Sequence, residues 1–501
     1  MRRSVRFAAV AGVIAAASFV IRADVQSQAS EIQLRLGDLL YSEGKYLDSL
    51  EAYRNALKTA SPDATKRPRV GVIASALRVA EFDLARKEAE LLHKADPISP
   101  DSMALYADAL WSAGLFEEAE TMYRDVLAKE PESARGHHGM ARALTARGRL
   151  DDGMNEAQAA LKLSPRDLEI HHTVGTIFER EHKYEEAAAA YSNYVNLLPN
   201  KDHSEKADWS RAEIRFLRSF GQRVPFETDP GAEDKLYTVD FRLVNEKVVV
   251  RAKVNDSSAQ DFVVDTGSEN TVITRNTAQK LGVTPVTYTL SAGVGRVGLR
   301  GLQLARIDSL ELGSLKIRNV PVLIKNPPLR DIPVKETESL SPLALGYSMV
   351  IDYKTHKLTF GKHLPGEQSD FDLPLRLYRL ATVRGTVDAH QANFVVDTGG
   401  EVISISQATA TALQKPVTGR KIALKVYGTS GWDEDAFLMP GINLAFDNIK
   451  YNNFPVVVLN LDAPSALLGF QLGGIVGHKF LSKYRVGIDL ERSMLHLKNV
   501  S

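Results

Sequence analysis

The sequence predicts a multidomain protein in which an all-α helical solenoid is followed by an all-β region of two lobes. Three observations lead to this fold class. Proline recurs every 34 residues, at Pro97, Pro131, Pro165 and Pro199. The helical period stops near residue 222, where a segment rich in proline and acidic residues begins. Beyond that segment the hexapeptide FVVDTG occurs twice, at residues 262–267 and 394–399.

Length, charge and composition narrow the class of protein. A chain of 501 residues is too long for one hydrophobic core, so several domains are expected. The 62 basic and 62 acidic residues balance, which argues against a nucleic-acid-binding protein because that function needs a basic excess. The sequence has no cysteine, which excludes disulfides, thiolate metal sites and cysteine nucleophiles.

The N-terminus has the pattern of an export signal. Arginines near the start precede the uncharged apolar run of residues 7–21, which suits a signal peptide and is short for a bilayer span. Small residues follow, so residues 1–29 are predicted as a signal peptide cleaved after Ala23 or Ala29. The alternative is an uncleaved membrane anchor through residues 7–21. Both interpretations place the rest of the chain outside the cytoplasm, in the periplasm or secreted.

Residues 30–220 form a repeating region. Gly114 and Gly148 keep the 34-residue spacing, and an acidic-then-alanine pattern recurs at residues 116–119 and 184–187. Each unit indicates two amphipathic helices ended by proline. The pattern resembles the tetratricopeptide repeat over roughly five units, with residues 201–220 as a closing helix. The resemblance implies a concave surface that binds peptides or partner proteins, with a pure spacer as the alternative.

Two features of the sequence bear on metal and cofactor binding. The pair His137-His138 recurs 34 residues later as His171-His172, so stacked repeats would bring these pairs together. No carboxylate stands at obvious ligand spacing, and we predict no metal site. The segment GVGRVG at residues 293–298 has glycines at dinucleotide-binding spacing, but no βαβ pattern follows it, so no nucleotide cofactor is predicted.

The β-rich region contains two copies of one unit. We predict a linker at residues 221–235, lobes at 236–361 and 372–501, and a link between the lobes at 362–371. In each copy, strands of alternating pattern precede FVVDTG and a glycine-rich hairpin follows it. One identical hexapeptide in each matching unit is a much stronger signal than a single turn of ordinary turn residues.

Each FVVDTG motif places a carboxylate on a tight turn at the end of an apolar strand. The two motifs resemble the active-site turns of aspartic peptidases of the retropepsin-like branch, over roughly residues 240–500. The resemblance implies that Asp265 and Asp397 form a catalytic pair. Two such side chains about 3 Å apart cannot both ionise, so they share one proton. One then acts as general base on a water, and the other donates to the leaving group.

The resemblance also assigns supporting roles to the residues that follow each aspartate. Thr266 and Thr398 are expected to brace the two turns by hydrogen bonds. Gly267 and Gly399 are expected to let the backbones approach closely. Ser268 is expected to hydrogen-bond Asp265, whereas Gly400 gives Asp397 no side-chain partner.

One departure from the family pattern concerns lobe one. The apolar-Gly segment of lobe two ends at Gly477, twelve residues before Asp489, whereas the segment assigned to lobe one ends at Gly346, six residues before Asp352. We therefore expect lobe one to lack a helical turn behind its active-site loop. The predicted function is an exported aspartic endopeptidase that cleaves peptide or protein substrates without a cofactor. The alternative is a catalytically inactive, peptidase-like module for binding or assembly.

Overall fold

The computed structural model describes residues 28–329, 336–366, 368–414 and 422–500. The predicted export signal therefore lies outside the described residues, except for residues 28 and 29, which are helical. None of the helices in the described ranges combines the length and apolar character needed to cross a membrane.

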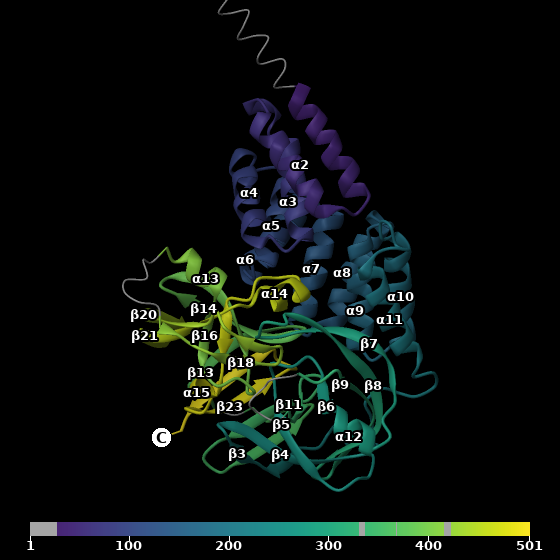
Figure 1. Ribbon diagram of the computed structural model, residues 1–501, viewed down its shortest axis with the longest axis vertical. Coiled ribbons are helices and arrows are strands. Elements are labelled where there is room, and N and C mark those ends of the chain that lie inside the picture. Colours follow the sequence, from purple (N-terminus) through teal and green to yellow (C-terminus); the bar gives the residue numbers. More distant parts are fainter. Residues whose placement is uncertain (1–27, 330–335, 367, 415–421, 501) are drawn as a thin grey trace, which may run out of the picture.

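The first part of the described chain is an array of paired antiparallel helices (Figure 1). It consists of a helix over residues 28–42, then α2 (Tyr46–Thr59), η1 (Pro62–Ala64), α3 (Lys66–Arg78), α4 (Phe82–Ala95), α5 (Pro100–Ser112), α6 (Phe116–Lys129), α7 (Ala134–Ala146), α8 (Leu150–Leu163), α9 (Leu168–Arg180), α10 (Tyr184–Leu197) and α11 (Glu205–Arg218). The repeating prolines stand two residues beyond the ends of α4, α6, α8 and α10, where proline stops a helix.

The turn between the paired helices has the same backbone conformation in each repeat. Gly114 and Gly148 have φ of +77° and +74°, and Ala80 and His182 adopt φ of +61° and +60° at the same phase. Glycine takes this left-handed conformation without steric cost. Close helix packing follows from small residues: an added Cβ on Gly139 would lie 2.2 Å from the Tyr123 ring. The sequence periodicity thus corresponds to a real structural repeat.

The second part of the chain is β-rich and begins with a nine-stranded sheet in the order β1-β9-β6-β10-β5-β4-β8-β7, with β3 on β4 and β8 also on β9. Its elements are β1 (Glu227–Thr228), β3 (Arg242–Val244), β4 (Lys247–Val254), β5 (Gln260–Val264), β6 (Thr271–Thr274), α12 (Arg275–Lys280), β7 (Pro285–Ala292), β8 (Leu299–Leu312), β9 (Leu315–Lys325) and β10 (Glu338–Leu340). Strand β1 lies within the segment predicted as a linker and pairs with β9.

The last part repeats this arrangement. It comprises β14 (Leu380–Val387), β15 (His390–Val396), β16 (Ile403–Ser406), α13 (Gln407–Ala412), β17 (Ile422–Ala423), β18 (Val426–Gly428), β19 (Gly431–Asp433), β20 (Phe437–Phe446), β21 (Ile449–Leu459), α14 (Asp462–Leu468), β22 (Gly474–Val476) and α15 (His478–Leu481). The sheet order β21-β16-β22-β15-β14 matches β9-β6-β10-β5-β4 of the first lobe.

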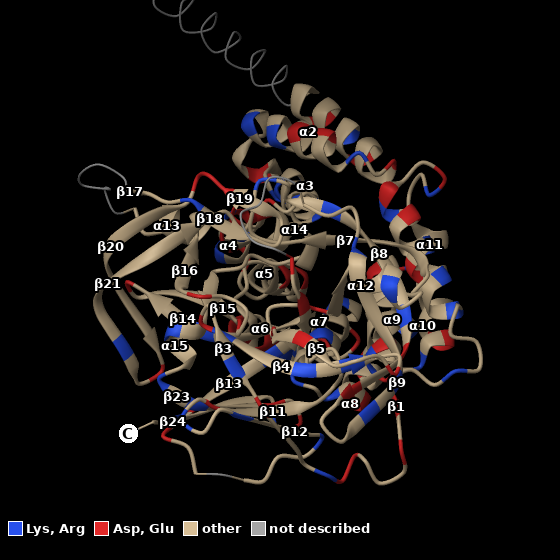
Figure 2. Ribbon diagram, turned by 60° about the horizontal axis from the view of Figure 1, so that its bottom comes forward, with Lys and Arg blue, Asp and Glu red and all other residues tan. Residues whose placement is uncertain are grey.

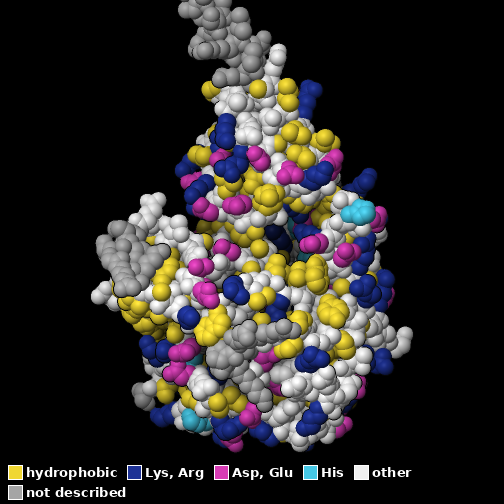
Figure 3. Space-filling view, viewed as in Figure 1, with side chains coloured by type: hydrophobic (Ala, Val, Ile, Leu, Met, Phe, Trp, Pro, Cys, Tyr) yellow, Lys and Arg dark blue, Asp and Glu magenta, His cyan; other side chains and the backbone are white. Residues whose placement is uncertain are grey.

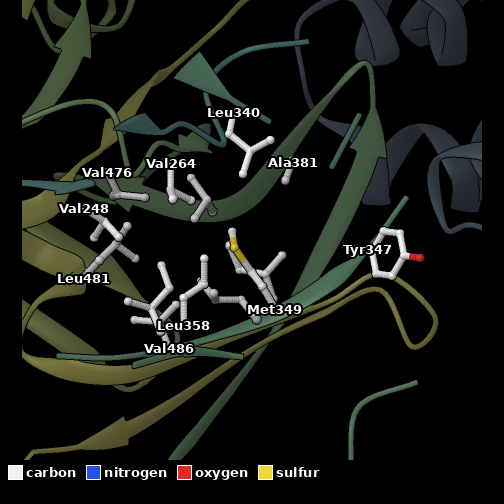
Figure 4. Packing of buried hydrophobic residues seen from close by; sticks show 14 of the residues in the cluster. Val248, Val264, Leu340, Tyr347, Met349, Leu358, Ala381, Val476, Leu481 and Val486 are labelled. Atoms are coloured by element: carbon white, nitrogen blue, oxygen red, sulfur yellow. The ribbon is translucent and has the colours of Figure 1, made fainter. Parts of the chain in front are cut away.

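A continuous sheet joins the lobes in the order β13-β24-β23-β11-β12-β2. Its strands are β2 (Tyr237–Asp240), β11 (Ser348–Asp352), β12 (Lys357–Gly361), β13 (Phe371–Tyr378), β23 (Tyr484–Asp489) and β24 (Met494–Asn499). At its centre β11 and β23 run antiparallel, with Val350 opposite Gly487. Buried side chains of both lobes, among them Val264, Met349 and Val486, form one core above this sheet (Figure 4). The lobes therefore share a hydrophobic core within one chain.

The helical array packs directly on both lobes. Against the second lobe, the Trp111 ring lies 5.5 Å from Tyr378 and the Phe116 ring 5.0 Å from Phe470, between centroids. Against the first lobe, α11 lies along β7, and Phe220 shares a buried cluster with residues of β8 and β9. In Figure 1, α5 to α7 lie over the second lobe and α10 and α11 lie beside the first. The array therefore spans the two lobes.

Ion pairs reinforce the contact with the second lobe. The buried Arg376 guanidinium contacts Glu117 at 2.9 Å and Glu120 at 3.5 Å, and Arg384 contacts Glu118 at 2.6 Å. Acidic and basic positions are interspersed over the helices and strands visible in Figure 2. The interface is thus fixed by directional as well as apolar contacts, since buried charges require partners.

Candidate active site

Each Asp-Thr-Gly turn follows a strand held in the middle of its lobe. Strand β5 runs parallel to β10, and the Asp265 N–H donates to the Leu340 carbonyl at 2.9 Å. Strand β15 runs parallel to β22, and the Asp397 N–H donates to the Val476 carbonyl at 3.0 Å. The same backbone contact therefore positions both predicted catalytic aspartates.

The two threonines bind each other's turn. The Thr266 N–H donates to Thr398 Oγ1 at 3.1 Å, and the Thr398 N–H donates to Thr266 Oγ1 at 3.0 Å. Each hydroxyl then donates to a strand carbonyl of the opposite lobe, at Val396 (2.6 Å) and Val264 (2.7 Å). Both threonine side chains are fully buried. This reciprocal network fixes the two turns at one relative position.

The glycines bring the carboxyl groups together. A Cβ on Gly267 would lie 2.5 Å from Asp397 Cγ, and a Cβ on Gly399 would lie 2.7 Å from Asp265 Cγ. Each carboxyl group therefore rests against the backbone of the opposite turn, and any larger residue would displace it. The structure thus brings together Asp265 and Asp397 from turns that are far apart in sequence.

The backbone donors around the pair are unequal. Asp265 Oδ1 accepts the Gly267 N–H at 3.0 Å, whereas Asp397 Oδ1 accepts both the Gly399 N–H at 2.8 Å and the Gly400 N–H at 2.9 Å. The prediction that Ser268 hydrogen-bonds Asp265 is wrong, because the Ser268 hydroxyl donates to the Asn270 carbonyl at 2.7 Å. The turn closes on itself at this position, so the hydroxyl points away from the carboxyl group.

Burial raises the pKa of both carboxyl groups, and the charge of Asp397 adds to the rise for Asp265. The pKa of Asp265 rises to about 7, first through desolvation and then through the charge of Asp397, with Lys247 and Lys325 opposing the rise. Desolvation also raises the pKa of Asp397, while the N–H groups of Gly399 and Gly400 oppose the rise. Because hydrogen bonds to an ionised carboxylate favour that form, the extra donor favours negative charge on Asp397. The pair therefore keeps a proton until the pH rises to about 7, and the extra donor on Asp397 favours that proton on Asp265.

The lobe-one segment behind the active-site turn lacks the helical turn that α15 (His478–Leu481) supplies in lobe two, as predicted, but it has not lost the corresponding length of chain. Strand β10, which ends at Leu340, occupies the place of β22, which ends at Val476. Ser341 therefore corresponds to Gly477, and it precedes Asp352 by eleven residues, against twelve between Gly477 and Asp489. The match of Gly346 to Gly477 was wrong because β10 contains Glu338 and Ser339, so this strand lacks the apolar pattern of its counterpart.

Ser341 supports the first turn, and sequence reasoning missed it. Its fully buried hydroxyl donates to the Ser268 carbonyl at 2.7 Å. In lobe two, backbone N–H groups at the start of α15 support the turn instead. The His478 N–H donates to the Gly400 carbonyl at 2.8 Å, and the Lys479 N–H donates to the Glu401 carbonyl at 2.9 Å. A serine directly after the short strand β10 is the only sequence signal of this role.

Two glycine-rich hairpins, one from each lobe, meet at their tips. One is formed by β7 and β8, and the other by β18 and β19. At their tips, the Arg296 N–H donates to the Trp432 carbonyl at 2.7 Å, and the Ser430 N–H donates to the Val294 carbonyl at 3.0 Å. A Cβ on Gly295 would lie 2.3 Å from the Ser430 backbone, so this contact requires glycine. The segments predicted as hairpins thus join into a single cover contributed by both lobes.

The residues four positions beyond the aspartates have different surroundings. Glu269 forms a two-pronged ion pair with Arg379 of the second lobe, at 2.6 and 3.1 Å. Its counterpart Glu401 pairs with Lys479 of its own lobe at 3.0 Å, where both side chains are more than half exposed. Sequence reasoning identified neither pair, because the partners lie far apart in the chain, 110 residues in the case of Glu269 and Arg379.

The repeated histidines make local hydrogen bonds. His137 contacts Glu156 at 2.6 Å and the Pro131 carbonyl at 2.8 Å, and His138 contacts Thr173 at 2.9 Å. Among the described residues, no group of three or more His, Asp or Glu side chains is arranged to hold a metal ion.

Family models match both parts of the chain. The model for aspartyl protease matches residues 250–349, and the model for gag-polyprotein aspartyl protease matches residues 383–472. Two models for the tetratricopeptide repeat match residues 110–177, and residues 14–65 with 75–134. The chain therefore carries domains of the aspartyl protease class. More particularly, it joins tetratricopeptide repeats to two retropepsin-like lobes in a single polypeptide.

Individual relatives resemble only part of the chain. The Hsp70-Hsp90 organizing protein of Triticum aestivum is 22% identical over 258 residues, which are 49% of this chain and 42% of that protein. The chain thus spans less than half the length of that relative. Among solved structures, a tetratricopeptide protein of Thermus thermophilus is 20% identical, with a TM-score of 0.30, over 34% of this chain and 93% of that chain. PilF of Pseudomonas aeruginosa is 14% identical, with a TM-score of 0.28, over 40% and 94%.

Proposed function

We propose that this protein is an aspartic endopeptidase in which Asp265 and Asp397 activate a water for attack on a peptide bond. The observation that carries the proposal is the pair of Asp-Thr-Gly turns locked by Thr266 and Thr398, with one carboxyl group against each glycine of the opposite turn. Such a pair, holding one proton, provides a base and an acid side by side. No cofactor is needed for this chemistry.

The unequal numbers of backbone N–H donors at the two aspartates assign their roles in the reaction. Asp397, with two backbone N–H donors, is the carboxylate that accepts the proton of the water. Asp265 carries the shared proton and polarises the scissile carbonyl through a hydrogen bond. It then donates this proton to the leaving amine. The hairpin tips around Gly295 and Ser430 cover the pair and exclude bulk water, which strengthens these electrostatic interactions.

The helical repeats are proposed to bind the polypeptide substrate or a partner protein. The family matches to the tetratricopeptide repeat support this role, since such arrays offer a concave surface for other chains. A non-enzymatic binding or assembly module remains the alternative function. It is favoured by the hydrogen-bonded hairpin tips, which close the cover above the pair.

We also propose that the protein acts outside the cytoplasm. The support is the sequence pattern of residues 1–29, with early arginines and an apolar run. Edman or mass-spectrometric sequencing of the mature N-terminus, after cell fractionation, tests this. A new N-terminus near residue 24 or 30 in an extracytoplasmic fraction is expected; a full-length soluble cytoplasmic chain would contradict it.

Digestion of a diverse peptide library tests the peptidase proposal. Wild-type protein should produce new termini at defined sites, and the chain with Asp265→Asn and Asp397→Asn together should produce none. A wild-type protein that cleaves no member of the library while binding some of them would support the binding module instead.

A further inference from the structure

The inner face of the helical array is lined by polar columns that follow the 34-residue phase. One column holds His138, His172 and Lys206, on α7, α9 and α11. A second column holds Glu179 on α9 and Glu213 on α11. They stand at the repeat position that Trp111 occupies on α5. Because repeats stack, residues at one phase lie next to each other along the array.

This face surrounds a hollow. Figure 3 shows the molecule hollowed between the array and the β lobes, with basic side chains in the depression. On the array, Asp108 and Arg142 pair at 2.6 Å, with 18% and 16% of their side chains exposed. Arg78 of α3 pairs with Glu169 of α9 across the array, and Gly44 lies against Pro199, with an added Cβ 3.3 Å from the proline ring. The first and last repeats thus bound the hollow at its far side.

The hollow meets the active site at Arg379. Tyr378, the last residue of β13, packs on Trp111 of the array, and the next residue, Arg379, pairs with Glu269 beyond the first catalytic turn. Arg379 also donates to the Leu467 carbonyl at the end of α14, the helix that contacts the β7 hairpin strand. Arg379 therefore contacts both the segment after the first catalytic turn and helix α14, next to the place where Tyr378 packs on the array.

Charge interactions connect the same groups. The charges of Glu179 and Glu269 both act on Glu213, whose pKa is raised to about 8 by desolvation and then by Glu179, while Arg379 opposes the rise. Arg379 also acts on His172, further along the inner face. These groups from the array and from both lobes therefore lie within electrostatic reach of one another.

The opposite end of the cleft has no such extension. Glu401, the counterpart of Glu269 in the second lobe, is 59% exposed and pairs with Lys479, which is 54% exposed. Glu269 and Arg379 are 29% and 35% exposed. The two lobes have matching strand orders, so Glu269 and Glu401 occupy equivalent positions beyond the two Asp-Thr-Gly turns. The array lies beside the Glu269–Arg379 pair, because Tyr378, the residue before Arg379, packs on Trp111.

We propose that a substrate polypeptide continues from the cleft, past the Glu269–Arg379 pair, into the hollow of the helical array, which binds it as an extended segment. This proposal rests on the proposed peptidase function and adds where the substrate is held beyond the scissile bond. Recognition is then one-sided: the chain on one side of the cleaved bond is bound by the array, and the chain on the other side leaves into solvent.

The lining suits a polypeptide. The histidines at 138 and 172 remain neutral near pH 7, because desolvation lowers their pKa to about 3 and about 4, so each imidazole offers one donor and one acceptor. Lys206 and Glu213 at the positions described above provide charges of both signs. This mixture matches peptide groups and varied side chains, whereas a nucleic acid would need a basic lining.

The test uses three peptides that share one cleaved core: the core alone, the core with an unstructured extension of about 15 residues before it, and the core with the same extension after it. An extended segment of that length reaches about 50 Å. For the wild-type chain, one extension should raise kcat/KM at least about fivefold through a lower KM, and the other should change it less than twofold. Equal gains from both extensions, or none, would overturn the proposal.

Maleimide labelling identifies the part of the protein that causes the gain in kcat/KM. The chain has no cysteine, so Lys206→Cys in the hollow and Lys162→Cys on α8 each provide one exposed site for a bulky maleimide. For each chain, kcat/KM of the favoured extended peptide is divided by that of the core, which removes any general loss of activity. Labelling at 206 should bring this ratio to about one, and labelling at 162 should leave it unchanged. An unchanged ratio after labelling at 206 would overturn the proposal.

A separate outcome concerns the peptidase function. If the wild-type chain cleaves none of the peptides, the proposed function fails, and fluorescence anisotropy with the same three peptides decides the binding proposal. Tighter binding of one extended peptide, abolished by the label at 206 and not at 162, would support it. Equal binding of all three would contradict it.

Discussion

Thr266 and Thr398 exchange hydrogen bonds across the lobe interface, each hydroxyl accepting the N–H of the other residue, at 3.0 and 3.1 Å. These bonds link the two halves of the site directly. They make the position of each aspartate depend on the opposite lobe, although the two turns are 132 residues apart in the chain.

Removing one hydroxyl should therefore damage both stability and activity. Thr266→Val leaves the Thr398 N–H without its acceptor in a fully buried position, which costs about 1–3 kcal/mol. Thermal unfolding should show a lower Tm, and kcat/KM should fall. Thr266→Ser retains the hydroxyl and serves as the matched control, with a smaller loss of both. Equal Tm and kcat/KM values in the valine and serine variants would show that the exchanged hydrogen bonds affect neither stability nor activity.

The fourth position of each turn should respond differently in the two lobes. A Cβ on Gly400 would lie 2.8 Å from Asp397 Oδ2, so Gly400→Ala should push the carboxylate and lower kcat/KM by about a hundredfold. Ser268→Ala removes only a hydroxyl that binds the Asn270 carbonyl, and should change kcat/KM by no more than about threefold. Steady-state kinetics on one peptide compares the two. A tolerated alanine at 400 would contradict the geometry of this turn.

Activity should depend on pH through the shared proton. The pKa of Asp265 is raised to about 7, so the singly protonated pair is lost as pH rises through that value. The kcat/KM of the wild-type chain should therefore fall about tenfold per pH unit above neutrality. A profile that stays flat up to pH 9 would rule out a pair that works with one proton.

The same raised pKa affects stability with a defined sign. The unfolded carboxyl group releases its proton near its ordinary value, whereas the folded one keeps it to about pH 7. The folded state thus binds more protons between these values, and its stability falls as pH rises through them. Asp265→Asn, which cannot ionise, should raise Tm relative to wild type at pH 8, and the difference should shrink at pH 4. A Tm difference that is independent of pH would contradict the burial of this charge.

The hairpin cover should require glycine at its tip. Gly295 has φ of +136°, and a Cβ there would meet the Ser430 backbone at 2.3 Å, so Gly295→Ala should open the contact and lower kcat/KM. Gly366 has no atom within 4 Å of an added Cβ, so Gly366→Ala is the matched control and should behave as wild type. Wild-type kinetics in the Gly295 variant would show that the joined tips have no part in catalysis.

The sequence predicted the parts of the structure that depend on repetition. The spacing of Pro97, Pro131 and the later prolines predicted paired helices because each proline ends one helix. The repeated FVVDTG predicted matching lobes because one strand and turn recur in both sheets. Local pattern sufficed in both cases.

Contacts between distant segments were not predictable in the same way. The pairing of Arg379 with Glu269 and the packing of Trp111 on Tyr378 join residues with no shared sequence pattern. Strand β10 was missed because two of its three residues, Glu338 and Ser339, are polar, and they are tolerated in the core only through hydrogen bonds such as that from Thr274 to Glu338. The prediction for Ser268 failed because the turn offered its hydroxyl a nearer acceptor.

The site should form within one chain. Val350 and Gly487 pair at the centre of a sheet that both lobes of one polypeptide complete, so specific activity should not fall on dilution. A mixture of Asp265→Asn chains with Asp397→Asn chains should stay inactive, because neither chain holds both carboxyl groups. Recovery of cleavage in the mixture would mean that lobes pair between chains.

The central claim is that Asp265 and Asp397 act as one catalytic pair, and the kinetics of the two single asparagine variants test it most directly. With a peptide that the wild-type chain cleaves, kcat/KM should fall at least about a thousandfold in Asp265→Asn and equally in Asp397→Asn, with circular dichroism spectra unchanged. Near wild-type turnover in either folded variant would contradict the account.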